Sequence, residues 1–334
     1  MSKLSPMQRQ LLKLYKSFKQ FCDKHHLRYY AVAGTAIGAI RHHGFIPWDD
    51  DIDLGMPIED FDKLKKIAAK SLPRHLSFKE SYWMGGKIHD TRTTVIDVRF
   101  LNTPQNYHGI YIDIFPLIGL PNDKTAREKF ITDIKLFQVN AELLEFYPEV
   151  SSFSVQDIVK WKKYLLYAND YNASKKLAAF CFFTCNGDGI RNPTIVPFED
   201  TEIPISSQYD ADLREHFGDY MTLPPKEKRK THDKYHIFDL NNPYSEYIHE
   251  YQNNPKWLLK LLDQNHQIEG ELTQLSNSLQ YILNNKELEI KKLQSQLNST
   301  SQELALIRSS KTHRLRHTLL KPIRKLKKGL KHDR

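Results

Sequence analysis

The pattern of hydrophobic and polar positions predicts a mixed α/β (α+β) domain over residues 1–250. Leu, Tyr and Phe side chains at helical spacing predict a helix over 5–25. Further helices are expected in the small-residue segment that ends at Arg41, over 57–71, which starts at a proline, and over most of 123–185. Short β-branched or aromatic runs predict strands at 29–33, 52–55, 93–101 and 110–117. Recurrent Pro and Asn predict an irregular segment over 191–250.

A different pattern begins after Pro255. Apolar or near-apolar positions recur at alternating steps of three and four residues from 258 to 307, with one pair of four-residue steps at 275–279–283. This spacing predicts a coiled coil over 255–308 that would join copies of the chain into a homo-oligomer. One long amphipathic helix packed on the preceding domain is the alternative interpretation.

Positive charge is concentrated at the C-terminal end. The 334 residues include 49 Lys and Arg against 40 Asp and Glu, a formal net charge of +9. Eleven of the basic residues and one acid lie in 308–334, so 1–307 holds 38 basic and 39 acidic residues. Leu and Ile recur among the cations of 309–334, and this basic amphipathic tail is typical of a segment that docks on an anionic membrane surface. RNA or another polyanion is the alternative partner, although a near-neutral 1–307 disfavours an extended nucleic-acid groove.

Composition indicates an ordinary globular protein. With 40% hydrophobic and 27% charged residues, wholesale disorder is excluded. Three cysteines cannot build a disulfide framework, and we interpret Cys181 and Cys185 as core residues rather than half of a zinc site. The N-terminus has no apolar secretory core, and the longest apolar stretch, 29–40, is about half of the roughly 20 residues of a spanning helix. We therefore expect a cytoplasmic protein.

The segment with the clearest chemistry runs from Gly34-Thr35 to Asp51-Ile52-Asp53-Leu54. Alternation along a strand puts Asp51 and Asp53 on one face, and Asp49 can join them from the strand entrance. Carboxylates this close repel one another unless a cation lies between them, and Mg²⁺ prefers oxygen ligands shared with phosphate. Gly34-Thr35, between a strand and a helix, offers backbone N–H groups and a hydroxyl to a phosphate. A solvated acidic loop is the plainer interpretation.

A second acid stands out in the run from Ile110 to Leu117. Ile110, Ile112 and Ile114 share one face of the predicted strand, whereas Tyr111, Asp113 and Phe115 share the other. A carboxylate between two aromatic residues needs a metal, a base role or a partner. Asp97 is the competing acid, but Arg99 lies on its own strand face and favours an ion pair there.

Four sequence motifs resemble the LicD/fukutin family of phosphotransferases. The first is the run from Gly34 through Arg41-His42-His43-Gly44 and Trp48-Asp49-Asp50-Asp51 to Gly55. The others are Arg92-Thr93-Thr94, then Gly109-Ile110-Tyr111-Ile112-Asp113-Ile114-Phe115-Pro116-Leu117, and Phe217-Gly218-Asp219-Tyr220-Met221 with Pro224-Pro225. The resemblance covers roughly 20–240. Phe217 stands where the family usually has Tyr, which is a mild departure.

The resemblance implies a nucleotidyltransferase core of the DNA polymerase beta type with helical additions. It also implies transfer of a phospho-alcohol, such as phosphocholine or ribitol phosphate, from a CDP-activated donor to a glycan. Cell-surface polysaccharides such as teichoic acid or lipopolysaccharide, or their lipid-linked precursors, would be the acceptors, which suggests peripheral association with the inner face of the membrane. By position, Asp49, Asp51 and Asp53 match the metal-binding acids for Mg²⁺, or Mn²⁺ in its place. Asp113 matches the acid of a neighbouring strand and is assigned a catalytic role with Asp51 and Asp53.

Several other residues are candidates for substrate binding. Arg41 can supply positive charge near the acids, and Lys87 and Arg92 resemble family positions that hold donor phosphates; a surface cation is the plainer interpretation. Trp48 and Tyr111 can stack on cytosine or enclose a quaternary ammonium, although aromatic residues beside strands often belong to the core.

Three classes of function remain open at this point. The first is phospho-alcohol transfer to a glycan with release of CMP. The second is nucleotidyl transfer to RNA or protein, in which the α-phosphate of a nucleoside triphosphate enters the acceptor. The third is a coiled-coil scaffold with an idle catalytic domain, which the intact acid set disfavours.

Overall fold

The computed structural model describes residues 4–81, 85–97, 109–146, 151–179, 183–231, 235–245 and 247, together with 294, 295, 298, 299 and 302. The chain divides into two units, Met1–Leu261 and Leu262–Arg334. In the second unit the five described residues are helical and exposed. Apart from these five, the predicted coiled coil over 255–308 and basic tail over 309–334 lie outside the described residues.

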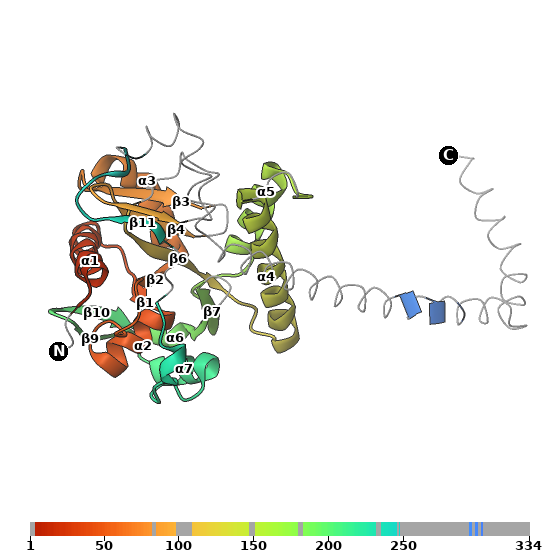
Figure 1. Cartoon of the computed structure of the whole chain (residues 1–334). Helices are drawn as coiled ribbons and strands as arrows, with labels where there is room; N and C mark the ends of the chain where they lie inside the picture. Colours follow the sequence, from red (N-terminus) through yellow and green to blue (C-terminus); the bar gives the residue numbers. More distant parts are fainter. Residues whose placement is uncertain are drawn as a thin grey trace, which may run out of the picture. The chain divides into compact units, whose positions relative to one another are not determined.

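A mixed sheet of seven strands, counted over the described residues, forms the centre of the first unit (Figure 1). Its main order is β1 (Tyr30–Ala31), β2 (Asp53–Pro57), β6 (Tyr111–Gly119), β4 (Gly86–Asp90) and β3 (Leu76–Glu80). β2 and β6 run parallel, whereas the other neighbours in this order are antiparallel. The far half of β6 pairs with β7 (Lys176–Ala179), which pairs with β8 (Phe183–Asn186). The long strand β6 therefore holds both parts of the sheet together.

One face of the sheet is apolar and is covered by α1 (Pro6–His25) and α3 (Ile58–Ser71). Ile52, Leu54, Ile112, Ile114 and Ile88 have almost no exposed surface, and Leu11, Phe18, Phe61 and Leu64 of the two helices share this core. The opposite face carries the partly buried alternate residues of β6, Tyr111, Asp113 and Phe115. The alternation expected for 110–117 is therefore confirmed.

Helices α4 (Lys124–Phe146) and α5 (Val155–Tyr167) form a pair beside β6 and β7 (Figure 1). Phe137 of α4 and Trp161 of α5 pack edge to face with their ring centroids 5.5 Å apart. Ile158 and Leu165 on α5 are fully buried. These two helices bury apolar surface at the end of the sheet where β6 turns to pair with β7.

The remaining elements show that two expectations were partly wrong. Residues 123–185 include the strands β7 and β8, and the described part of 191–250 is not irregular but includes helices, a two-stranded hairpin and a strand that pairs with residues 94–97. The elements of this part are α6 (Gly187–Arg191), β9 (Thr194–Phe198), β10 (Thr201–Ile205), α7 (Tyr209–Phe217), the 3₁₀ helix η2 (Lys226–Lys228) and β11 (Tyr235–Asp239), which pairs with β5 (Thr94–Asp97). Pro197 and Pro204 suggested irregular chain, but a two-stranded ribbon leaves alternate N–H groups outside the ladder and tolerates proline there.

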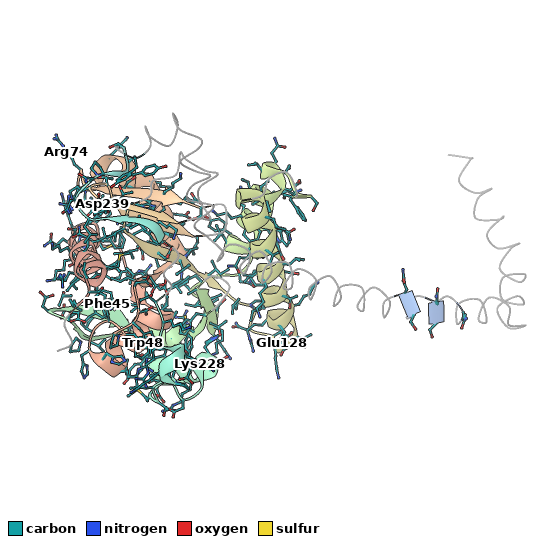
Figure 2. All side chains as sticks on the ribbon, in the orientation of Figure 1. Phe45, Trp48, Arg74, Glu128, Lys228 and Asp239 are labelled. Carbon is teal, nitrogen blue, oxygen red and sulfur yellow. The ribbon has the colours of Figure 1, made fainter. Side chains whose placement is uncertain are left out.

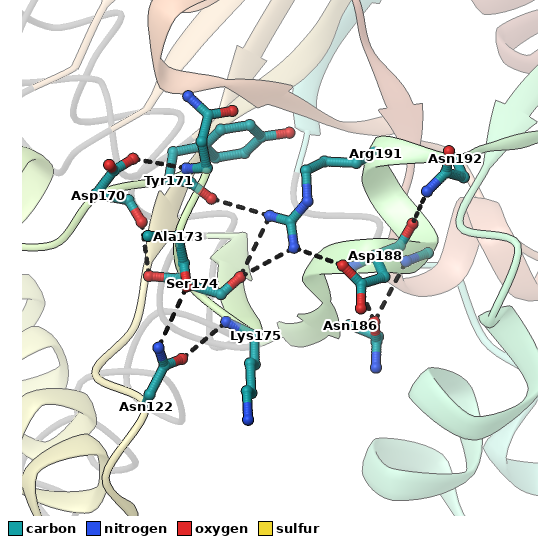
Figure 3. A network of polar contacts seen from close by, with 12 residues as sticks. Asn122, Asp170, Tyr171, Ala173, Ser174, Lys175, Asn186, Asp188, Arg191 and Asn192 are labelled. Carbon is teal, nitrogen blue, oxygen red and sulfur yellow. Dashed lines mark hydrogen bonds and ion pairs between the residues drawn. The ribbon is translucent and has the colours of Figure 1, made fainter.

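A polar network joins α6 to the segment that precedes β7 (Figure 3). The Arg191 guanidinium donates to the carbonyls of Tyr171, at 3.0 Å, and Ser174, at 3.2 Å, and pairs with the Asp188 carboxylate at 2.8 Å. Asn186 caps α6 by accepting from the Asp188 N–H at 2.9 Å. These contacts satisfy backbone groups that short elements leave unpaired.

Several expectations are confirmed. The predicted helices over 5–25, up to Arg41 and over 57–71 correspond to α1, α2 (Ala33–His42) and α3, and the α/β class is correct. The expected core position of Cys185 is confirmed by its burial, whereas Cys181 lies outside the described residues. The assignment of the sheet to a nucleotidyltransferase core stays a prediction. No helix in the described part of the chain combines the length and the apolar character needed to cross a membrane.

Candidate active site

Three charged residues lie in one row across β2, β6 and β4. Asp53 is in register with Asp113 on the parallel neighbour, and Lys87 is in register with Asp113 on the antiparallel neighbour. Residues in register point to the same face, and adjacent strands lie about 4.8 Å apart, so the three side chains are direct neighbours. The sequence predicted the two acids and gave Lys87 as a candidate for binding a donor phosphate; the structure shows that Lys87 lies within β4.

Lys87 compensates the charge of Asp113. Its Nζ lies 2.7 Å from Asp113 Oδ1, with both side chains only 13–14% exposed. The same ammonium lies 3.4 Å from the centroid of the Tyr111 ring, on the face where a cation is attracted by the π electrons. Asp113 is therefore the partnered acid that its place between two aromatic residues required.

Asp53 lies in an unfavourable environment for a carboxylate. Burial raises its pKa well above the ordinary value, and the negative charges of Asp51, Asp113 and Asp49 raise it further, in that order, while Lys87 lowers it. The row therefore carries more negative charge than Lys87 compensates. A divalent cation with oxygen ligands would relieve this repulsion, so the chemistry of the donor set fits Mg²⁺ or Mn²⁺. In the arrangement described, no three His, Cys, Asp or Glu side chains of the described residues form a metal-binding group.

The loop before β2 carries Asp49 and Asp51 and is held from two sides. Gln8 of α1 is buried, and its Nε2 donates to the carbonyls of Ile46, at 3.2 Å, and Asp49, at 2.8 Å. Glu199, in the turn of the β9–β10 hairpin, accepts from the Phe45 N–H at 2.9 Å. Both contacts join residues at least 38 positions apart. Sequence reasoning missed Gln8 and Glu199, because nothing in the local pattern shows which distant loop a polar side chain will reach.

Helix α2 begins next to the acids, as the Gly34-Thr35 motif predicted. A Cβ added at Gly34 would lie 3.0 Å from Asp49 Oδ2, so the glycine lets this carboxylate approach the first turn of the helix. The hydroxyl of Thr35 is buried and accepts from the Asp53 N–H at 2.8 Å. Thr35 thus ties α2 to β2, and the predicted contact of its hydroxyl with phosphate stays a prediction.

Arg92 has a carboxylate partner. Its Nε lies 2.9 Å from Asp90 Oδ1 and its second terminal nitrogen 2.8 Å from Asp90 Oδ2, while Gln10 Nε2 donates to Asp90 at 2.8 Å. Asp90 is completely buried, whereas the Arg92 side chain is 58% exposed. The guanidinium therefore stabilises the buried acid at the end of β4, and its predicted role in holding a donor phosphate stays a prediction.

Arg41 and Trp48 lie on the side of Asp49 that faces α7 and the segment after it. Arg41 donates to the carbonyl of Tyr220, and the Trp48 ring packs edge to face with His42 at a centroid distance of 6.2 Å. Arg229, which the sequence did not indicate, lies over Trp48 with its guanidinium carbon 5.4 Å from the ring centroid. Figure 2 labels Trp48 and Lys228, the residue before Arg229, in the same part of the folded unit.

A small pocket opens at the start of β6, beside Asp51. It is lined by Met7, Leu11, Asp50, Asp51, Val95, Ile110 and Tyr111. The apolar lining comes from α1, β5 and β6, and the polar lining comes from the acidic loop. The hollow is small, with room for about one water molecule beside the acidic loop.

The site is thus a set of acids at the starts of two parallel strands, backed by a helix and a cationic side chain. Residues 26–153 match the LicD/FKTN/FKRP nucleotidyltransferase domain. The lipopolysaccharide cholinephosphotransferase LicD of Haemophilus influenzae is 25% identical over 268 residues, which cover 70% of this chain and 97% of that protein. The resemblance found in the sequence is therefore confirmed.

Two shorter matches are to uncharacterized rickettsial proteins. A protein of Rickettsia prowazekii is 33% identical over 98 residues, 29% of this chain and 35% of its own length. A protein of Rickettsia typhi is 42% identical over 50 residues, 15% of this chain and 16% of its own length. Their names state no activity, so they add only sequence similarity over part of the chain.

Proposed function

We propose that the chain transfers a phospho-alcohol, phosphocholine or a similar group, from a CDP-activated donor to a hydroxyl of a cell-surface glycan or its lipid-linked precursor, and releases CMP. The observation that carries this proposal is the row of Asp53, Asp113 and Lys87, in a chain that is similar to a lipopolysaccharide cholinephosphotransferase over almost that protein's full length. Acids grouped in this way suit phosphoryl transfer, in which charge neutralisation and positioning do most of the work.

The reaction balances as an in-line displacement. The oxygen of the acceptor hydroxyl attacks the distal phosphorus of the donor, the bond from that phosphorus to the bridging oxygen breaks, and CMP leaves with the bonding electron pair. Asp113 acts either as the base that takes the hydroxyl proton or as a metal ligand. Lys87, 2.7 Å from Asp113, holds this carboxylate through an ion pair.

Asp51 and Asp53, with Asp49 at the strand entrance, would hold the divalent cation. When bound, Mg²⁺, or Mn²⁺ in its place, would supply positive charge against the donor diphosphate. The residues themselves keep the acceptor and donor aligned, and Gln8 and Glu199 keep the acidic loop in place.

The direct test is to incubate the protein with CDP-choline, CDP-ribitol or CDP-glycerol, Mg²⁺ and a glycan acceptor, and to measure CMP. One donor is expected to yield CMP, and Asp51→Asn combined with Asp53→Asn should abolish its release while circular dichroism stays unchanged. CMP release by the double variant at the wild-type rate would refute the site assignment. Entry of an α-phosphate label from a nucleoside triphosphate into an RNA or protein acceptor, without CMP, would instead support nucleotidyl transfer.

We further propose that the basic tail over 309–334 brings the enzyme to the inner face of an anionic membrane and that the coiled coil over 255–308 joins the chains into oligomers. The charge pattern and the 3-4 spacing support these roles. Deletion of 309–334 should reduce sedimentation with anionic liposomes, and undiminished sedimentation would refute the docking role.

A further inference from the structure

Two arginines from distant parts of the chain both donate to the backbone of the segment that follows α7. Arg41 lies in the last turn of α2, and Arg229 directly follows η2. Arg229 Nε donates to the carbonyl of Pro224 at 2.8 Å, and its guanidinium lies over the Trp48 ring. Arg41 donates to the carbonyl of Tyr220. These contacts tie Arg41 to the segment after α7 and place Arg229 over Trp48, which lies in the loop that carries Asp49.

The positive charge of each guanidinium group acts on the other. Burial lowers the pKa of Arg41, the positive charge of Arg229 lowers it further, and Asp49 opposes this effect. Both side chains are half-buried. Within the described residues neither forms an ion pair shorter than 4 Å, in contrast to Arg28, Arg191 and Arg214, which all pair with carboxylates. Partly desolvated like charges are unfavourable unless an anion lies between or beside them.

We propose that Arg41 and Arg229, flanked by Trp48, bind a phosphate group of a substrate next to the acidic row. Guanidinium groups bind phosphate through two parallel N–H donors, and each arginine uses only some of its five donors in the contacts described. Asp49 connects the two sites, because its carboxylate lies at the start of α2 and within electrostatic reach of Arg41. A phosphorylated ligand would extend from the acids towards Trp48.

The phosphate can come from either substrate of the proposed reaction. It is part of the donor's diphosphate or part of a phosphorylated, lipid-linked acceptor. The assignment of the phosphate to the donor or to the acceptor rests on the proposed function. The existence of an anion site at Arg41 and Arg229 does not depend on that function. A purely structural role would tie the 220–229 segment to α2 through hydrogen bonds alone, and it would need no positive charge.

The test measures pyrophosphate binding by calorimetry at low ionic strength with EDTA present, so that no metal is available to the acids. The wild type is expected to bind pyrophosphate, and Arg229→Gln and Arg41→Gln should each weaken binding about tenfold or more. Lys228→Gln is the matched control, because it removes one exposed positive charge next to Arg229 and should change affinity less than about twofold. Arg229→Lys keeps the charge and should be intermediate, which provides a second variant if Arg41→Gln lowers thermal stability.

Two results would overturn the site: no pyrophosphate binding by the wild type, or equal affinities for wild type and Arg229→Gln. The source of the phosphate follows from steady-state kinetics. A rise of KM for the CDP-alcohol in Arg229→Gln assigns the site to the donor, and a rise of KM for the glycan acceptor alone assigns it to the acceptor. If the wild type turns over no CDP-alcohol, the proposed function fails while the pyrophosphate comparison still decides the anion site.

Discussion

Lys87 and Asp113 form an ion pair between two neighbouring strands, with 2.7 Å from Nζ to Oδ1. The strand register places these residues opposite each other, and the Lys87 ammonium also covers the Tyr111 ring. Asp53 lies on the other side of Asp113, and Lys87 lowers its pKa less than burial and the neighbouring acids raise it. The pair therefore divides the charged row into a compensated acid and an uncompensated one, and the two should respond oppositely to mutation.

Removal of the lysine should destabilise the fold. Lys87→Met leaves Asp113 without its partner in a site where both side chains are only 13–14% exposed, and the expected loss is about 3 kcal/mol of unfolding free energy. Lys87→Met combined with Asp113→Asn should recover part of that loss, because no unpaired charge remains. Urea denaturation of the four proteins measures this coupling. Additive losses in the double variant would mean that the ion pair does not stabilise the fold.

Neutralising Asp53 should have the opposite effect on stability. Its folded pKa is raised by burial and by neighbouring acids, so at pH 7 its charged form opposes folding. Asp53→Asn should therefore raise Tm in EDTA, by about 2–4 °C for each kcal/mol of repulsion relieved, while turnover is lost. Asp113→Asn is the matched control, because the same chemical change there breaks an ion pair and should lower Tm. A lower Tm for Asp53→Asn would show that the acids do not repel one another in the fold.

The contact of Gln8 with the acidic loop should matter for catalysis. Gln8→Ala removes the donor to the carbonyls of Ile46 and Asp49 and should lower kcat by about tenfold to a hundredfold through displacement of the loop. Gln8 also accepts from the Ser5 N–H at 3.0 Å in the capping box of α1. Ser5→Ala is therefore the control: it should cost about 1 kcal/mol of stability with kcat unchanged. Equal kcat values for Gln8→Ala and wild type would contradict the positioning role.

The contacts of Asp90 predict that its carboxylate stabilises the fold at neutral pH and that this contribution is lost in acid. Burial opposes its ionisation, but hydrogen bonds from Arg92 and Gln10 outweigh this and lower the folded pKa below the ordinary value. A carboxylate whose pKa is lower in the folded chain than in the unfolded chain stabilises the fold at pH values above its unfolded pKa, about 3.9 for Asp. This contribution is lost as the pH falls through the pKa of the folded state. The stability difference between wild type and Asp90→Asn should therefore shrink as the pH falls below about 4.

Denaturation curves between pH 6 and pH 2 measure this difference. Glu128→Gln, which changes an exposed carboxylate on α4 (Figure 2), is the control and should show a much smaller dependence on pH over the same range. A difference between wild type and Asp90→Asn that stays constant across the range would show that the Asp90 pKa is not depressed.

The sequence by itself determined the features that depend on local periodicity. The α1 helix, the Gly34-Thr35 junction at α2 and the alternation of Tyr111, Asp113 and Phe115 against the isoleucines all follow from side-chain spacing along one element. The acids of the site could be identified for the same reason, since Asp51 and Asp53 are close in the chain.

Tertiary structure alone decided which distant residues complete the site. Lys87 meets Asp113 through strand register, Gln8 reaches a loop 41 residues away, and Arg229 approaches Trp48 from beyond η2. Strands β3 and β4 were not expected, because their short sequences show no strong alternation and form strands by pairing with β6 and with each other. Register and long-range contacts depend on how the whole sheet buries its apolar face, and a local pattern does not contain that information.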